Sequence, residues 1–214
     1  MSDWLVVPVK SLRGGKTRLA HALAPAHRRA LMDQLLVHIV TQATPYPGLD
    51  KTVIVSGCGE TRARAIELGV RAIAETRYGL NAAIRQGQLA LRQWGASKML
   101  VVPCDLPMLD SEDLRQLSQL CKPDLIAIAP DRRGVGTNGL CLDPHLEFVF
   151  QFGPDSYRGH IASALRLGLE HDTAHCPGLA FDVDTPEDLA EWYQSEENRF
   201  RNAPLTADRQ YGAP

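Results

Sequence analysis

Long apolar runs are absent from the sequence: no stretch approaches the roughly 18 residues that a membrane-spanning helix needs. At the N-terminus, Asp3 precedes a short apolar run that Lys10 ends, which is not the pattern of a secretory signal. An excess of either charge is also absent, since 23 lysines and arginines stand against 25 acidic residues and the net charge is −2. This balance argues against non-specific binding to nucleic acid or to a membrane surface. We therefore expect a soluble, unexported protein with a small-molecule partner.

The cysteines form no pattern that indicates disulfide bonds or a metal site. They are odd in number, widely spaced and without a C-x-x-C pair, which argues against both a disulfide framework and a structural zinc site. A reducing cytoplasm fits this usage best. The five are Cys58, Cys104, Cys121, Cys141 and Cys176.

The length predicts one domain. With 214 residues, 44% of them hydrophobic and 22% charged, the chain can bury one sizeable core, and we find neither internal repeats nor low-complexity tracts. We expect this domain to span residues 1–194. Residues 195–214 are polar, contain Pro204 and Pro214 and lack apolar periodicity, so a flexible tail is expected there.

Short β-rich apolar runs alternate with segments of helical periodicity. The first run, residues 4–9, is apolar at consecutive positions, as in a strand buried on both faces of a parallel sheet. Helix starts are indicated by Pro25, by Ser111 as an N-cap and by Thr185 before a proline. The pattern predicts an α/β fold with a mostly parallel central sheet flanked by helices, and ligands beyond the carboxyl ends of the strands. The other predicted strands span residues 52–56, 70–74, 98–103 and 125–129.

A basic loop follows the first predicted strand. The glycine pair 14–15 lets backbone amides approach an anion, and Lys10, Lys16 and Arg18 surround the pair with positive charge, which predicts a polyphosphate site. A P-loop is disfavoured because the position five residues before Gly15 is Lys10 rather than glycine. The alternative is a solvated basic turn, which we rank lower because the loop leaves a buried strand.

Residues 134–139 match G-x-G-x-x-G, but the next residues read as a short strand rather than the helix that a dinucleotide fingerprint must open. We therefore reject an NAD site. Two interpretations remain open. One is a flexible loop whose Thr137 hydroxyl and Asn138 amide suit a small anionic substrate, and the other is a hairpin turn without a ligand.

Three aspartates stand at predicted strand ends. Asp105 follows the strand that ends at residue 103, and Asp182 and Asp184 lie two residues apart, where extended backbone aims both to one face. Magnesium prefers such hard oxygen ligands and accompanies substrate phosphates, which predicts a Mg²⁺ site beside the basic loop. The alternatives are that Asp184 supports the cap of the next helix and that Asp105 closes a turn.

A glycine turn at residues 152–155 precedes Ser156, which is expected at the start of a helix running to about residue 168. There the Ser156 hydroxyl would act both as the cap and as a donor to a phosphate or carboxylate. His160 falls about one turn later on the same face and is a candidate substrate contact only.

The motifs, in chain order, are 8–12 (PVKSL), 16–19 (KTRL), 79–83 (GLNAA), 103–107 (PCDLP), 136–138 (GTN), 152–156 (FGPDS) and 182–189 (DVDTPEDL). Each is weak alone, but the ordered set, covering roughly residues 6–192, resembles one family. These are the guanylyltransferases that activate a phosphorylated three-carbon acid in the biosynthesis of coenzyme F-420. The resemblance implies a Rossmann-like nucleotidyltransferase sandwich.

The resemblance also implies a role for each site, with Mg²⁺ as the cofactor. It assigns GTP to Pro8, Lys10, Lys16, Arg18, Gly79 and Asn81, the phospho-acid to Thr137, Gly153 and Ser156, the metal to Asp105, Asp182 and Asp184, and catalysis to Lys10, Lys16, Arg18 and Asp105. Two departures are Gly139 and the pair at 14–15, where alanines are usual; neither removes a ligand.

The implied reaction transfers GMP from GTP to the phosphate of the acid and releases pyrophosphate. An anionic phosphate nucleophile needs no general base, only charge cancellation and alignment. We favour 3-phospho-D-glycerate over phosphoenolpyruvate and 2-phospho-L-lactate, because Cys104 and His160 could receive its extra hydroxyl. A downstream deazaflavin transferase and a second copy of the chain, in a homodimer, are candidate partners. The alternatives are a nucleotidyltransferase for another phosphorylated metabolite, such as molybdopterin, and a non-catalytic nucleotide-binding module.

Overall fold

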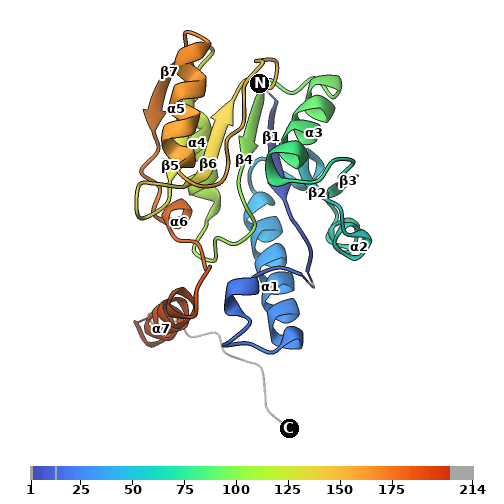
Figure 1. Ribbon diagram of the computed structural model, residues 1–214, viewed down its shortest axis with the longest axis vertical. Coiled ribbons are helices and arrows are strands. Elements are labelled where there is room, and N and C mark those ends of the chain that lie inside the picture. Colours follow the sequence, from blue (N-terminus) through green and yellow to red (C-terminus); the bar gives the residue numbers. More distant parts are fainter. Residues whose placement is uncertain (1, 13, 203–214) are drawn as a thin grey trace.

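One central sheet has its strands in the order β3-β2-β1-β4-β6-β5-β7 (Figure 1). The computed structural model describes residues 2–12 and 14–202, with the backbone alone at 196–202. Neighbouring strands are parallel except where β6 lies antiparallel between β4 and β5. The mostly parallel sheet expected from the sequence is confirmed. The strands are β1 Asp3–Pro8, β2 Thr52–Ser56, β3 Arg71–Ala74, β4 Lys98–Val101, β5 Leu125–Pro130, β6 Thr137–Leu142 and β7 Glu170–Thr173.

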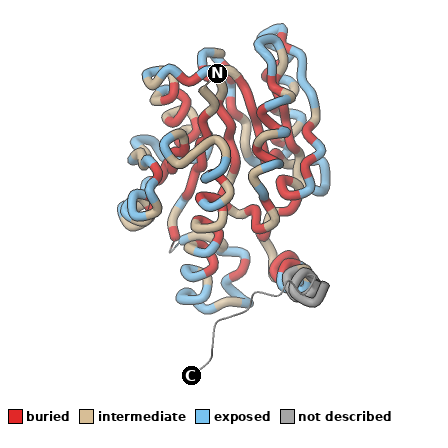
Figure 2. Tube along the Cα trace, turned by 180° about the vertical axis from the view of Figure 1, so that it is seen from behind, coloured by how far each residue is buried: buried red, intermediate tan, exposed pale blue. Residues whose placement is uncertain are grey.

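Helices cover both faces of the sheet. Because successive side chains of a strand point to opposite faces, Leu5 and Val7 of β1 enter one apolar cluster while Trp4 and Val6 enter the other. Helices α1, α2, α4, α6 and α7 contribute to the first cluster, and α3 and α5 to the second. Figure 2 shows the buried strands between helices whose outer sides are exposed. The helices are α1 Pro25–Ala43, α2 Gly59–Glu67, α3 Leu80–Gln93, α4 Ser111–Leu120, α5 Ser156–Arg166, α6 Pro177–Ala180 and α7 Pro186–Asn202, with short 3-10 helices at Thr17–Leu19 and Leu49–Lys51.

The chain reverses its direction across the sheet after β3. From β1 it moves outward through α1 and α2 to β3, and α3 then crosses back to β4 on the other side of β1. Parallel crossovers are right-handed, so a reversed direction of travel places α3 on the opposite face from α1 and α2. The carboxyl ends of β1 and β4 therefore form the topological switch point, where ligands bind in open α/β sheets.

Helix α4 starts with a cap one residue earlier than the sequence indicated. The Asp110 carboxylate accepts hydrogen bonds from the backbone N–H of Glu112 at 2.8 Å and of Asp113 at 2.9 Å, and the Asp113 carboxylate accepts from the Asp110 N–H. This reciprocal pair is a capping box. The expectation that Ser111 is the N-cap is wrong, because Asp110 has the extended backbone of a cap and Ser111 is already helical.

Helix α7 continues beyond Ser195, where the sequence led us to expect a flexible tail, as far as Asn202. Apolar periodicity is a poor guide here, because glutamate and arginine, which recur in this stretch, have high intrinsic helix propensity. Residues 203–214, the rest of the expected tail, lie outside the described residues. Within the described part of the chain, no helix has the length and apolar character needed to cross a bilayer.

Candidate functional site

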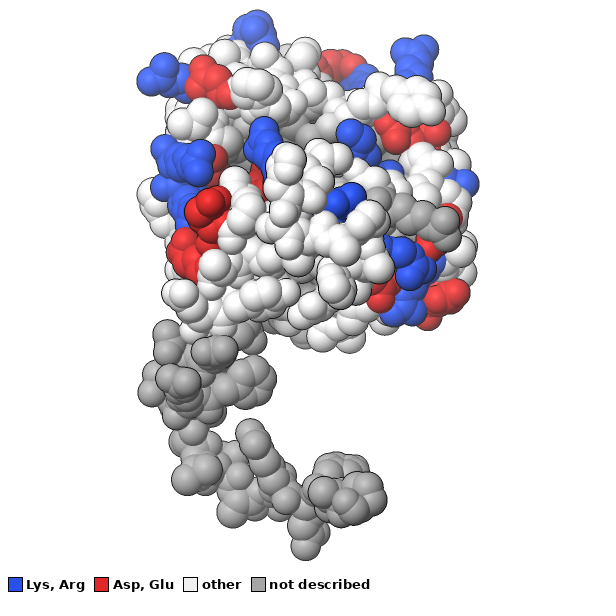
Figure 3. Space-filling model, turned by 60° about the horizontal axis from the view of Figure 1, so that its bottom comes forward, with Lys and Arg blue, Asp and Glu red and all other residues white. Residues whose placement is uncertain are grey.

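A cleft of about 840 Å³ opens at the switch point. Its walls come from the basic loop after β1, the segment between β3 and α3, and the segment after β4. Figure 3 brings this end of the molecule forward and shows basic side chains beside acidic ones rather than a patch of one sign. The expected site residues that line the cleft are Pro8, Lys10, Lys16, Arg18, Gly79, Asp105 and Asp184.

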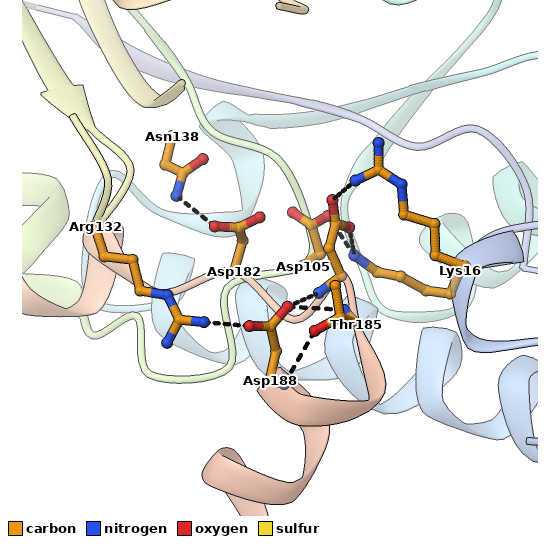
Figure 4. A network of polar contacts seen from close by, with 9 residues as sticks. Lys16, Asp105, Arg132, Asn138, Asp182, Thr185 and Asp188 are labelled. Atoms are coloured by element: carbon orange, nitrogen blue, oxygen red, sulfur yellow. Dashed lines mark hydrogen bonds and ion pairs between the residues drawn. The ribbon is translucent and has the colours of Figure 1, made fainter. Parts of the chain in front are cut away.

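Lys16 links the loop after β1 to two carboxylates (Figure 4). Its Nζ lies 2.5 Å from Asp105 Oδ2 and 2.8 Å from Asp184 Oδ1, and its side chain is only 5% exposed. Burial by itself would lower the pKa of this ammonium, but the two carboxylates raise the pKa well above its usual value. Lys16 is therefore a fixed positive charge at the centre of the site.

Asp184 faces the cleft because a different carboxylate supports the start of α7. Asp188 accepts hydrogen bonds from the backbone N–H of Asp184 at 3.0 Å and of Thr185 at 2.7 Å, and the Thr185 hydroxyl accepts from the Asp188 N–H at 3.3 Å. Asp184 is left to bind Lys16 and also Arg18, whose Nη1 lies 3.1 Å away. Thr185, the residue before α7, is therefore the N-cap that the sequence indicated, and Asp188 completes a capping box with it. The alternative that Asp184 supports this cap is wrong.

Asp182 completes the group of carboxylates. It lies between Asn138 and Asp105 in Figure 4, and Asn138 Nδ2 donates to its Oδ1 at 3.3 Å. Burial, together with the charge of Asp105, raises the pKa of Asp182 above its usual value. The charges of Asp105 and Asp184 therefore both act on the Asp182 carboxylate, although the three are not grouped as ligands of one ion.

These carboxylates have the donor chemistry that Mg²⁺ prefers, since all three offer hard anionic oxygens. As the side chains stand, no three His, Cys, Asp or Glu residues among those described are grouped to hold a metal. The Lys16 ammonium instead bridges two of the three aspartates. The residues fit the ion in charge and donor type, and Lys16 already marks the place as one that binds a cation.

Thr137 is hydrogen-bonded to a buried histidine. His160 Nδ1 lies 3.0 Å from Thr137 Oγ1, and His160 Nε2 lies 3.0 Å from the backbone nitrogen of Gln151. Since Nε2 accepts from that N–H, the hydrogen-bond network assigns the ring proton to Nδ1, which donates to Thr137. Burial lowers the pKa of His160 to about 4, so the ring is neutral. The proton of the Thr137 hydroxyl remains available for an anionic substrate.

The residues expected to bind the acid do not line the main cleft, and one local expectation is wrong. Of the two conformations left open for residues 134–139, the structure shows a turn between the antiparallel strands β5 and β6, and Thr137 is the first residue of β6. The Asp131 carboxylate closes this turn by accepting hydrogen bonds from the Arg133 and Val135 N–H groups. Ser156 is not the N-cap of α5. That position belongs to Asp155, whose backbone is left-handed, so Ser156 is the buried first residue of the helix.

Asn81 also does not line the main cleft, although Gly79 and Leu80 before it do. Its side-chain amide binds both backbone groups of Phe152: Nδ2 donates to the carbonyl at 3.0 Å, and Oδ1 accepts from the N–H at 2.8 Å. Gly153, the next residue, has a φ of 135°, a conformation that favours glycine. The structure thus places Asn81 against the backbone of the segment expected to bind the acid.

Several cleft residues were missed in the sequence. Glu75, Thr76, Arg77 and Tyr78 line the cleft, and the Glu75 carboxylate accepts the Gly79 N–H at 2.8 Å. Their signal was a polar segment between a predicted strand end and a glycine that precedes a helix. Arg132, which does not line this cleft, was also missed. Its guanidinium binds Asp188, and this pairing left no local signal because the two residues lie far apart along the chain.

The fold and the cleft together define a nucleotidyltransferase-like protein. A solved nucleotidyl transferase from Methanothermobacter thermautotroptrophicus superposes with a TM-score of 0.67 at 19% identity, covering 94% of this chain and 98% of that one. At that identity the likeness shows the fold alone. It agrees with the Rossmann-like nucleotidyltransferase sandwich that the motifs implied.

A family model described as "Guanylyl transferase CofC like" matches residues 4–202, and the chain belongs to this family of guanylyltransferases. It is 38% identical to the phosphoenolpyruvate guanylyltransferase of Rubrobacter xylanophilus, covering 89% of this chain and 93% of that protein. It is 37% identical to the enzyme of the same name from Sphaerobacter thermophilus, covering 89% and 92%. The resemblance inferred from the ordered motifs is confirmed.

Proposed function

We propose that this guanylyltransferase transfers GMP from GTP to the phosphate of phosphoenolpyruvate, on the route to coenzyme F-420. The observation that carries the proposal is the buried ammonium of Lys16, which Asp105 and Asp184 hold in the cleft at the switch point. A cleft of about 840 Å³ is ample for a nucleoside triphosphate.

The triphosphate is assigned to the loop after β1. Lys10 and Arg18 are exposed cations that line the cleft, and the glycines at 14 and 15 bring backbone close to the same space. The nucleoside then extends toward Gly79 at the start of α3, where the helix N-terminus also presents free N–H groups. Neutralisation of phosphate oxygens by these groups favours a transition state in which negative charge spreads over the transferred phosphoryl group.

The acid is assigned to the space beside Thr137, Gly153 and Ser156. The expectation of 3-phospho-D-glycerate relied on Cys104 and His160 both facing the acid and receiving its extra hydroxyl. Cys104 lines the main cleft, which Thr137, Gly153 and Ser156 do not line. Both His160 ring nitrogens are already hydrogen-bonded, to Thr137 and to the Gln151 backbone. The close relatives named above are phosphoenolpyruvate guanylyltransferases, which supports phosphoenolpyruvate as the first acid to test.

In the proposed reaction a phosphate oxygen of the acid attacks the α-phosphorus of GTP, and the bond to the β-phosphate oxygen breaks to release pyrophosphate. The nucleophile is already anionic, so no residue has to remove a proton. The chain supplies alignment and charge: Lys16 stays protonated beside Asp105, and Thr137 donates a hydrogen bond to the acid. Mg²⁺, held by Asp105, Asp182 and Asp184, would supply neutralisation of phosphate oxygens when bound.

The decisive experiment incubates the protein with GTP, Mg²⁺ and each of phosphoenolpyruvate, 3-phospho-D-glycerate and 2-phospho-L-lactate. Pyrophosphate release is followed in time, and the products are identified by mass. We expect the highest kcat/KM with phosphoenolpyruvate. A clear preference for 3-phospho-D-glycerate would restore the expectation drawn from the sequence. No pyrophosphate with any of the three acids would contradict the proposed function.

A separate variant tests the assignment of Mg²⁺ to the three aspartates. Asp182→Asn keeps the shape of the side chain but removes one anionic ligand, so turnover should fall by at least about 100-fold at saturating Mg²⁺ while the far-ultraviolet circular dichroism stays unchanged. Asp124→Asn, at an exposed aspartate before β5, is the matched control and should keep wild-type turnover. Wild-type activity in Asp182→Asn, or after removal of metal by a chelator, would overturn the assignment.

A further inference from the structure

Helix α3 binds a different loop on each side of the stripe that it buries against the sheet. The buried stripe contains Ala83, Ile84 and Leu91. At 3.6 residues per turn, Asn81 and Gln86 lie about 140° apart around the helix, one on each flank of this stripe. Each of the two carries a side-chain amide, and each amide binds backbone of a separate loop.

Asn81 holds the segment between β6 and α5. That segment, residues 143–155, contains no helix or strand, so its backbone groups need partners outside regular structure. Asn81 binds both the N–H and the carbonyl of Phe152. Further along the same face of α3, Gln88 Nε2 donates to the Leu146 carbonyl at 2.9 Å and Arg92 Nε to the Pro144 carbonyl at 2.7 Å.

The contact at Phe152 continues to the expected acid ligands. The Phe152 ring packs edge-on against His160, with 4.6 Å between ring centroids. His160 in turn donates to Thr137, and Gly153 follows Phe152 directly in the chain. A shift of the Phe152 backbone would therefore move Gly153 and loosen the ring that orients the Thr137 hydroxyl.

Gln86 makes the equivalent contact on the nucleotide side. Its Oε1 accepts from the Thr76 N–H at 2.9 Å and from the Thr76 hydroxyl at 3.1 Å, and its Nε2 donates to the Ala74 carbonyl. Thr76 lines the cleft, as do Glu75 and Gly79 next to it. The loop that closes the nucleotide end of the cleft is thus held by a second side-chain amide of the same helix.

We propose that Asn81 and Gln86 are paired positioning residues, Asn81 for the loop that binds the phospho-acid and Gln86 for the loop that binds GTP. The inference rests on the proposed function for the identity of the two substrates. It gives Asn81 a different role from the nucleotide contact that the family resemblance implied, because both polar atoms of its amide are engaged by Phe152. One rigid helix thereby sets the relative placement of both substrates.

The test compares Asn81→Ala with Gln86→Ala. For each variant, the GTP dissociation constant is measured by titration without acid, and KM for phosphoenolpyruvate is measured at saturating GTP. Asn81→Ala should raise KM for the acid about tenfold and change the GTP dissociation constant less than about twofold. Gln86→Ala should do the reverse. Gln93→Ala, an exposed amide on the same helix, is the matched control and should change neither constant.

Three outcomes of the binding and kinetic measurements overturn the inference. Weaker GTP binding in Asn81→Ala with an unchanged KM for the acid would make Asn81 a nucleotide contact. An equal rise of the GTP dissociation constant and of KM for the acid in both variants would indicate general destabilisation. No change of either constant in either variant would show that the two amides do not position the substrates. Asn81→Asp, which keeps the acceptor for the Phe152 N–H but loses the donor, should fall between wild type and Asn81→Ala.

A structural readout separates this inference from the proposed function. Hydrogen exchange should quicken in peptides covering residues 150–154 in Asn81→Ala, and in peptides covering 74–77 in Gln86→Ala, each without a change in the other peptide. If the wild type turned over none of the three acids, the proposed function would fail, while the exchange data and GTP titrations would still decide whether each amide holds its own loop. Unchanged exchange in both variants would overturn the inference whatever the substrate.

Discussion

At the scale of single residues, the site depends on polar side chains that are partly withdrawn from water. Lys16 would lose charge on burial if it were alone, but Asp105 and Asp184 hold it in the charged form. His160 has no such partner, and burial keeps it neutral. At neutral pH Lys16 is therefore a buried cation and His160 a neutral ring, and the surroundings of each group set its charge.

The neutral state of His160 predicts a loss of stability in acid. Its pKa falls from 6.5 in the unfolded chain to about 4 in the fold. Because the unfolded chain binds the proton more tightly, this contribution is fully present above pH 6.5 and is lost as the pH falls toward 4. Over that window we expect the free energy of unfolding to drop by on the order of 3 kcal/mol from this residue.

Chemical denaturation at a series of pH values measures this contribution. His160→Gln, which keeps a polar side chain but does not titrate, is the comparison, since other groups contribute equally to both proteins. The difference in the free energy of unfolding between wild type and variant should be largest above pH 6.5 and shrink toward pH 4. A difference that stays constant with pH would contradict the low pKa of His160.

At the scale of elements, the predictable parts of the site are those that follow strands. Lys10 and Asp105 come directly after the apolar runs that form β1 and β4, so their meeting at one edge followed from the parallel sheet. Contacts between residues that are far apart along the chain were not predictable. The amide of Asn81 meets the Phe152 backbone 71 residues away, and a sequence shows neither the distance nor the direction of such a contact.

Local conformations that decide the exact start of an element were also beyond the sequence. Ser156 and Ser111 both looked like caps, but in each case the aspartate before the serine takes that position. Asp155 does so through a left-handed backbone without a side-chain cap, and Asp110 through its carboxylate. Residue type alone indicates that a helix begins nearby, while one residue of backbone geometry decides which side chain faces the site.

The cap of α7 is expected to matter for activity as well as for stability. Asp188→Ala removes the acceptor for the Asp184 and Thr185 N–H groups and also the partner of Arg132, so it should cost at least about 1–2 kcal/mol of stability and let Asp184 move. Asp110→Ala removes the cap of α4 at a similar cost. We expect kcat/KM to fall at least fivefold only in Asp188→Ala, because only that cap fixes a carboxylate of the site.

Denaturation curves and steady-state kinetics on both variants check this prediction. A stability loss in both variants with a kinetic loss confined to Asp188→Ala would support the role of the α7 cap in placing Asp184. If Asp188→Ala kept wild-type kcat/KM despite its lower stability, the position of Asp184 would not depend on the cap.

At the scale of the whole molecule, the fold brings positive side chains together at the cleft although the chain as a whole is not basic. The chain has a net charge of −2, and the face shown in Figure 3 mixes both signs. Attraction of a triphosphate therefore depends on the few cations that line the cleft, Lys10, Lys16, Arg18 and Arg77, rather than on a general positive field. The homodimer and the transfer of product to a downstream enzyme stay predictions, to be tested by light scattering and by coupled assays.

This local cationic site predicts that GTP binding weakens with salt to a limited degree. Lys10 and Arg18 are exposed, with the Arg18 side chain 74% accessible, so dissolved ions screen their attraction for phosphate. Lys16, at 5% exposure, is screened much less. Between low salt and about 0.5 M KCl at constant Mg²⁺, the GTP dissociation constant should rise about tenfold. Arg18→Ala should bind GTP more weakly than the wild type at low salt, and its affinity should depend less on salt.

Isothermal titration at four salt concentrations measures both effects, with Lys122→Ala, an exposed lysine away from the cleft, as the control. A salt-independent GTP affinity in the wild type, or an unchanged slope in Arg18→Ala, would contradict the assignment of the triphosphate to the loop after β1.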